Sequence, residues 1–187
     1  CCEDRNPENR LGVACVEWTS PQSLLPPGLL LVDTPGLDAF GHDAHEELTL
    51  RQFLPMADLV LYVTSIRNPF KAPDLALVGA LMENDQRALF VLSQCDVETD
   101  EVQGGRVRRT AEDKVARHLG RLNQDVKRHT SLPAFGVVAV SARRGQRGFA
   151  TRAGAEWQSS NLDALVSRLA GLATDLESVA VSARVRR

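Results

Sequence analysis

Short apolar runs, each about the length of one strand and each followed by a loop, constrain the fold of this chain most strongly. The runs are Leu29–Val32, Leu59–Val63, Ala88–Leu92 and Phe135–Val140. A strand buried on both faces of a sheet shows this near-continuous apolar pattern, without the alternation of a half-exposed strand. Because helical segments separate the runs, we expect an α/β fold with a mainly parallel sheet flanked by helices.

Further elements follow from spacing and from start signals. A capping-box-like start at Asp43 predicts a helix that ends near Pro55. The final helix is predicted from a stripe of leucines and valines that follows a Ser160-x-x-Asp163 start. The remaining expectations are a strand at Val13–Trp18, a helix at Asp74–Met82, a helix carrying Val107, Ala111, Val115, Leu119, Leu122 and Val126, and the last helix at Asn161–Ala180.

Composition excludes several classes of protein. A chain of 187 residues with 43% hydrophobic and 25% charged residues suits one globular domain. The net charge of −2 argues against a dedicated nucleic-acid binder. No apolar run reaches the ~18–20 residues that span a bilayer. The four cysteines have no metal-binding spacing, which favours reduced thiols in a cytoplasmic protein.

The loop after the first run reads Asp33-Thr34-Pro35-Gly36. In parallel sheets ligands bind beyond the carboxyl ends of the strands, so this loop is a candidate site. The Asp33 carboxylate is the hard oxygen ligand that Mg²⁺ prefers. Gly36 can offer its backbone N–H to a phosphate at close range because it has no side chain. The alternative is an ordinary strand-to-turn sequence.

Two later loops also follow apolar strands. The first reads Ser93-Gln94-Cys95-Asp96, and the second begins with Ser141-Ala142. A carboxylate at Asp96 could accept hydrogen bonds from the N1–H and N2–H₂ groups of guanine, which adenine lacks. The small residues of the second loop would let backbone N–H groups approach a base carbonyl. Taken alone, each loop is equally compatible with a surface turn.

Together, in this order, the three loops resemble the guanine-nucleotide motifs of the Ras-like GTPase fold. The phrases Leu30–Leu37 and Ala57–Val63 resemble the dynamin-like large GTPases, and the similarity spans about residues 11–180. The resemblance implies a P-loop NTPase fold that binds GTP and GDP with Mg²⁺, the ion being held at Asp33 through water. It also implies a mobile switch from Leu37 to about Glu47. The implied nucleotide-binding residues are Asp33, Thr34, Pro35, Gly36, Ser93, Gln94, Asp96, Ser141 and Ala142.

The resemblance further implies the role of each group. Gly36 would bond the γ-phosphate, Asp96 would select guanine, and Ser141 with Ala142 would line the base edge. Gln94 stands where the family has a lysine whose stem packs on the base, so the interaction keeps its packing and loses its charge. For the parent protein the family implies GTP hydrolysis that drives membrane remodelling, self-association through the GTPase domain, and a cytoplasmic or peripheral membrane location.

The phosphate-binding motif G-x-x-x-x-G-K-S/T does not occur in this sequence, whose three lysines never follow a glycine. We therefore expect residues 1–180 to be the C-terminal two-thirds of a GTPase domain that lacks the P-loop strand, with little GTP turnover by this chain alone. The start at Cys1 rather than Met fits a fragment or a processed product. Residues 181–187 are expected to be a basic tail or the start of a helical stalk.

Two other functions stay open. One is a degenerate GTPase-like interaction module without turnover, and the other is a translation-factor-class GTPase that acts on the ribosome or RNA. The segment Gly104–Thr130 carries eight Lys or Arg residues against three acidic ones. It is either the solvated face of a packed helix or a surface for anionic lipid or a partner. His42 and His45 are interpreted as surface loop residues.

Overall fold

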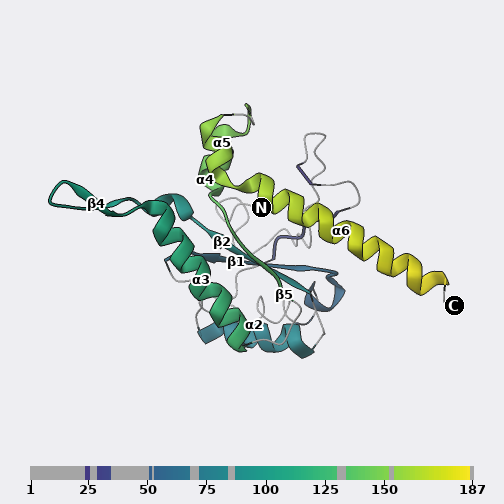
Figure 1. Ribbon diagram of the computed structural model, residues 1–187. Coiled ribbons are helices and arrows are strands. Elements are labelled where there is room, and N and C mark those ends of the chain that lie inside the picture. The colour runs from purple at the N-terminus through teal and green to yellow at the C-terminus, as the bar shows by residue number, and fades with distance from the viewer. Residues whose placement is uncertain are drawn as a thin grey trace, which may run out of the picture.

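The computed structural model describes residues 24, 25, 29–34, 51, 53–67, 72–83, 87–129, 134–151 and 154–185 (Figure 1). The elements in chain order are η3 (Leu54–Met56), β1 (Val60–Ser65), α2 (Ala72–Glu83), β2 (Ala88–Ser93), η4 (Cys95–Val97), β3 (Glu101–Gln103), β4 (Arg106–Arg109), α3 (Ala111–His129), β5 (Ala134–Ala139), α4 (Ala142–Gly148), α5 (Ala155–Ser160) and α6 (Leu162–Val185). The predicted strand Val13–Trp18, the segment Leu37–Glu47 and the start of the predicted helix at Asp43 lie outside the described residues.

A parallel three-stranded sheet of order β1-β2-β5 forms the centre of the described fold. The central strand β2 is the most apolar, and its residues from Ala88 to Leu92 are all buried. The three strands lie where the runs Leu59–Val63, Ala88–Leu92 and Phe135–Val140 predicted them, within two residues at each end. The predicted α/β class with a parallel sheet is therefore confirmed for this part of the chain.

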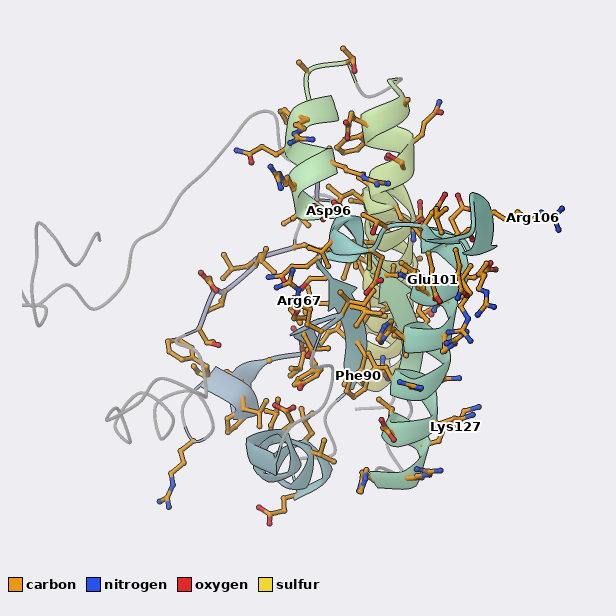
Figure 2. All side chains as sticks on the ribbon, turned by 90° about the vertical axis from the view of Figure 1, so that its left-hand side faces the viewer. Arg67, Phe90, Asp96, Glu101, Arg106 and Lys127 are labelled. Atoms are coloured by element: carbon orange, nitrogen blue, oxygen red, sulfur yellow. The ribbon has the colours of Figure 1, made fainter. Side chains whose placement is uncertain are left out.

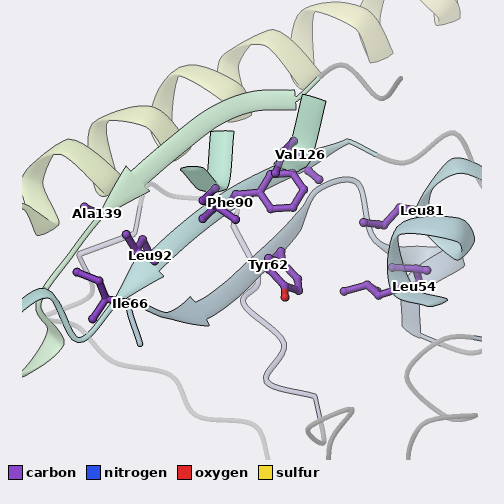
Figure 3. Close-up of a cluster of buried hydrophobic side chains, with 11 residues drawn as sticks. Leu54, Tyr62, Ile66, Leu81, Phe90, Leu92, Val126 and Ala139 are labelled. Atoms are coloured by element: carbon purple, nitrogen blue, oxygen red, sulfur yellow. The ribbon is translucent and has the colours of Figure 1, made fainter. Parts of the chain in front are cut away.

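Helices cover both faces of this sheet (Figure 1). Alternate residues of β2 point to opposite faces, so Phe90 packs with Leu81 of α2 and Val126 of α3 on one side (Figure 3). On the other side Leu89 and Val91 pack with residues of α6. Burial on both faces explains why these strands lack polar alternation.

The run Leu29–Val32 departs from the prediction. It forms no strand, and the exposed fractions of Leu30, Leu31 and Val32 are 79%, 61% and 50%. Among the described residues β1 pairs with β2 alone, and Val63 in β1 is 60% exposed. An apolar run becomes a doubly buried strand only where neighbouring strands complete its hydrogen bonds, and the described residues supply none beside Leu29–Val32.

The predicted helix carrying Val107 begins later than expected. Val107 lies in β4, which pairs antiparallel with β3 in a hairpin. Gly104 and Gly105 form its turn with φ values of 59° and 74°, the left-handed conformations that a two-residue hairpin turn requires. Helix α3 then begins at Ala111, after Thr110 and Asp113 exchange capping hydrogen bonds of 3.1 and 3.2 Å.

The C-terminal helix α6 confirms the helix predicted at Asn161–Ala180 and continues to Val185. Its start differs from the prediction, because Ser160 ends the preceding helix α5 and Asn161 adopts a left-handed conformation between the two helices. Asp163 accepts a hydrogen bond from Trp157 Nε1 at 2.7 Å instead of completing a capping box with Ser160. Among the described residues no helix is both long and apolar enough to span a bilayer.

Candidate functional site

The loops that follow β1, β2 and β5 meet at the carboxyl edge of the sheet. Backbone hydrogen bonds tie them together, with Ile66 N donating to Ser93 O at 3.0 Å and Cys95 N donating to Val140 O at 3.3 Å. This edge is where parallel α/β sheets bind ligands. The loop after β2 and the loop after β5, each a candidate from sequence, therefore lie next to each other at this edge.

Asp96 and Ser141 form the strongest polar contact of this site. Ser141 Oγ donates to Asp96 Oδ1 at 2.7 Å. The Ser141 side chain is buried, with 2% of its surface exposed, and it also accepts from Arg144 N at 3.2 Å as the N-cap of α4. Asp96 itself is only partly buried.

Several groups keep the Asp96 carboxylate ionised. The hydrogen bond from Ser141 lowers the pKa of Asp96 below its ordinary value of 3.8, and the charges of Arg143 and Arg144 act in the same direction. An ionised carboxylate accepts hydrogen bonds and donates none. At neutral pH the site therefore presents a fixed acceptor, as reading the N–H edge of a base requires.

Replacing Ser141 by alanine is expected to raise the pKa of Asp96, because the largest cause of its lowering is removed. A lowered pKa stabilises the folded state above the ordinary pKa, and that contribution is lost as pH falls through the lowered value. In Ser141→Ala the loss should occur at higher pH. Carboxyl ¹³C NMR titration of Asp96 measures the shift. Ser93→Ala is the matched control, since the Ser93 hydroxyl bonds Thr64 O, and an unchanged pKa in Ser141→Ala would contradict the assignment.

Gln94 and Ser93 fix the shape of the loop. Gln94 has a φ of 60°, in the left-handed region that non-glycine residues rarely adopt. Ser65 Oγ donates to Gln94 Oε1 at 2.9 Å and so holds the side-chain amide against the end of β1. Ser93 Oγ donates to Thr64 O at 2.8 Å. The amide is thereby oriented with its oxygen engaged.

Residues at the junction of α5 and α6 hold the backbone around Ser141 in place. Ser141 N donates to Ser160 O at 2.9 Å, and Asn161 Nδ2 donates to Ala139 O at 2.8 Å. Ser160 is fully buried, and its hydroxyl donates to Trp157 O at 2.6 Å. Sequence analysis missed these residues as parts of the site, because their contribution depends on a contact between segments about 20 residues apart.

Cys95 is expected to react slowly with alkylating reagents although it lies beside the site. Burial is the main cause that raises the pKa of its thiol to about 11, so the reactive thiolate is scarce at pH 8. Peptide mass spectrometry after iodoacetamide treatment at pH 8 should show Cys95 labelled much more slowly in the folded chain than in the urea-unfolded chain. Equal labelling rates would show that the thiol is not protected.

The structure brings some of the predicted site residues together and leaves others apart from them or outside the described residues. It brings together Ser93, Gln94, Asp96, Ser141 and Ala142. Asp33 is exposed and Thr34 half-buried in the non-strand segment, while Pro35, Gly36, His42 and His45 lie outside the described residues.

The described residues contain no cluster of side chains that could hold a metal ion by themselves. Within the described ranges no three His, Cys, Asp or Glu side chains gather in the way that an all-protein metal site needs. Mg²⁺ is usually held by only one or two carboxylates together with substrate phosphates and water. A single exposed carboxylate such as Asp33 is compatible with that mode of binding.

Comparison with known proteins decides the family. The protein-family model described as "Dynamin family" matches residues 2–95, about half of the chain. The chain belongs to the dynamin family. The resemblance noted in the sequence is therefore confirmed, and the P-loop GTPase fold that this membership implies is compatible with the parallel sheet and its covering helices. Membership of the dynamin family points to guanine-nucleotide binding.

A curated relative is much longer than this dynamin-family chain. The chain is 27% identical over 97 residues to an "Uncharacterized protein in xynA 3'region" from Caldicellulosiruptor sp. (strain Rt8B.4). The aligned region covers 52% of this chain and 24% of that protein. The chain thus spans about a quarter of the length of its relative.

Proposed function

We propose that the loops after β2 and β5 bind the guanine base of GTP and GDP. Asp96 accepts hydrogen bonds from the N1–H and N2–H₂ groups of the base, and Ser141 with Ala142 lines its edge. The observation that carries this proposal is the 2.7 Å hydrogen bond from the buried Ser141 hydroxyl to Asp96, at the carboxyl ends of parallel strands. It keeps the acceptor ionised and oriented before the ligand arrives.

Selection against adenine follows from the same arrangement. Adenine presents a ring nitrogen acceptor where guanine has N1–H, and it has no amino group at C2. Placed against Asp96, adenine would offer the carboxylate no donor from the base, so the hydrogen bonds that guanine makes would be missing. Leaving a desolvated charged group unpaired costs more than an average hydrogen bond contributes. Gln94 supports the base by packing, and Ser93 holds the loop to β1 through Thr64.

The phosphate end of the nucleotide is assigned to the loop that begins at Asp33. We propose that Asp33, through water, and the nucleotide phosphates hold Mg²⁺, with Thr34, Pro35 and Gly36 completing the loop. When bound, Mg²⁺ neutralises charge on the phosphates. The exposed Asp33 carboxylate is free to take this role.

In the longer protein to which such a chain corresponds, we propose GTP hydrolysis coupled to membrane remodelling, with self-association through the GTPase domain and a cytoplasmic or peripheral membrane location. These 187 residues are expected to release little phosphate, because the sequence offers no G-x-x-x-x-G-K-S/T loop to hold the β-phosphate. The missing motif also favours a second function, a degenerate GTPase-like interaction module without turnover. Magnesium-dependent phosphate release that Asp33→Ala abolishes would refute the expectation of low turnover.

The test of the proposed site is an NMR titration of the chain with GDP and with ADP. We expect GDP to shift the backbone amides of residues 93–97 and 141–144, with ADP at the same concentration leaving them in place. Amides in the α2 segment serve as the internal control. Shifts of equal size with both nucleotides, or shifts confined to segments away from β2 and β5, would refute the assignment of the base site.

A further inference from the structure

The β3–β4 hairpin, which precedes α3 in the chain, projects away from the body of the domain (Figure 1). Every residue of the two strands is exposed. Val102 lies directly across from Val107, and the two side chains are 59% and 55% exposed. Facing residues on neighbouring strands point to the same side of the ribbon, so the hairpin presents an apolar pair to solvent.

The base of the hairpin is fixed to α3. Asp100 Oδ1 accepts from Ala111 N at 2.8 Å. Lys114 Nζ donates to Thr99 O at 2.9 Å and lies 3.7 Å from Glu98 Oε2. These contacts join the segment before β3 to the first turn of α3, and they fix the base of the hairpin to the helix.

In β4 Arg109 lies on the same face of the ribbon as Val107, while Arg106 and Arg108 point to the opposite face, and further cations lie along α3. Their spacing places Arg117, Arg121 and Arg128 on one exposed stripe of the helix, opposite the buried Leu122 and Val126. Figure 2 shows Arg106 at the tip of the hairpin on the same side as Lys127 of α3. We call this set the basic surface; its arginines are Arg106, Arg108, Arg109, Arg117, Arg121 and Arg128.

Acidic side chains offset only part of this charge. Glu101 lies 3.8 Å from Arg109 Nη1, and Asp125 lies 3.7 Å from Arg128 Nη1. Glu112 and Asp113 occupy the first turn of α3, where they complement the helix dipole. The strand β4 itself holds three arginines and no acid. The basic surface therefore keeps a positive charge at its projecting end.

We propose that the basic surface binds an anionic lipid membrane, with Val102 and Val107 entering the headgroup boundary. Surface cations are attracted to anionic headgroups, and an apolar group beside them adds interfacial burial. A nucleic acid would also satisfy the arginines, but it offers no apolar environment for the valine pair. This lipid contact belongs to the described residues themselves, and it deepens the membrane role proposed above without requiring a bound nucleotide.

Vesicle co-sedimentation of the full chain tests the proposal. Vesicles of phosphatidylserine and phosphatidylcholine should bind the chain, and binding should weaken as salt rises. Vesicles of phosphatidylcholine alone should bind it far less. Combining Arg106→Gln, Arg108→Gln and Arg109→Gln should lower the partition coefficient about a hundredfold, as expected for the loss of three surface cations.

Two variants separate charge from packing. Lysine at the same three arginine positions keeps the charge and should keep most of the binding. Val102→Ser with Val107→Ser should weaken binding about tenfold at unchanged charge, because apolar burial is lost. A thermal unfolding curve of each variant, compared with that of the native chain, tests whether the fold is intact.

Three results would overturn the lipid proposal. They are absence of binding to anionic vesicles, equal binding by the glutamine variant, and arginine-dependent binding of RNA without binding of vesicles. GDP titration of the same preparations keeps the two proposals separate. Vesicle binding without GDP binding would refute only the guanine site, and GDP binding without vesicle binding would refute only the lipid surface.

Discussion

Asp96→Asn should lower the affinity for GDP about a hundredfold, since each hydrogen bond to a charged group contributes about 1.5–3 kcal/mol. The asparagine oxygen can still accept from guanine N1–H, but its amide N–H₂ then faces the N2–H₂ group of the base. The variant leaves the backbone and the size of the side chain unchanged. Isothermal titration calorimetry with GDP measures the loss.

Xanthosine diphosphate supplies the matched control for this variant. Xanthine carries a carbonyl at C2 in place of the amino group, so the asparagine N–H₂ can donate to it. Asp96→Asn should therefore prefer xanthosine diphosphate to GDP, reversing the preference of the native chain. An unchanged affinity of Asp96→Asn for GDP would contradict the role of Asp96 in reading the base.

Trp157→Ala should lower the free energy of unfolding by about 3–5 kcal/mol, the usual cost of removing a buried aromatic side chain. Trp157 is 2% exposed, packs edge-on against Phe149, and donates from Nε1 to Asp163 at 2.7 Å. Alanine keeps the backbone carbonyl that accepts from the Ser160 hydroxyl, so any effect on Ser141 should come from a shift of α5 and be smaller than the effect on stability. Urea unfolding followed by circular dichroism measures the change.

Trp157→Phe separates packing from hydrogen bonding at this position. It keeps an aromatic ring but removes the donor to Asp163 and part of the ring volume, so a smaller loss of about 1.5–3 kcal/mol is expected. A loss below about 1 kcal/mol in Trp157→Ala, within the range of ordinary surface substitutions, would show that α5 contributes little to the fold.

The strands of the sheet could be predicted because burial on both faces selects a near-continuous run of apolar residues. Ala88–Leu92 shows it best, since all of its side chains are apolar and all are buried. Leu29–Val32 shows the same apolar pattern and yet forms no strand, and only Leu29 of its four side chains is half-buried. An apolar run indicates that a segment is suited to burial. Whether it becomes a buried strand depends on the strands beside it.

The hairpin and the small helices could not be read as easily. Val107 falls by chance at helical spacing from Ala111, although Gly104-Gly105 is itself a hairpin signal. Helix α4 depends on close packing at a glycine. A Cβ on Gly148 would clash with the backbone nitrogen of Trp157, a contact that only the folded chain reveals.

For the candidate site, too, some features could be predicted from the sequence and others depend on tertiary contacts. That Asp96 and Ser141 lie at the same edge of the sheet was predictable, because each follows an apolar strand and parallel strands end at one edge. The direct bond between them and the support from Ser160 and Asn161 arise from tertiary contacts across many residues. Local sequence patterns carry no information on such contacts.

The most direct test of the guanine-binding account is a comparison of affinities of this chain for GTP and ATP, measured by competition against a fluorescent guanine nucleotide in the presence of Mg²⁺. The account predicts that GTP and GDP displace the probe and that ATP does so at least about a hundredfold less well, as the loss of both hydrogen bonds to Asp96 requires. Displacement by ATP at the same concentration as GTP would contradict it.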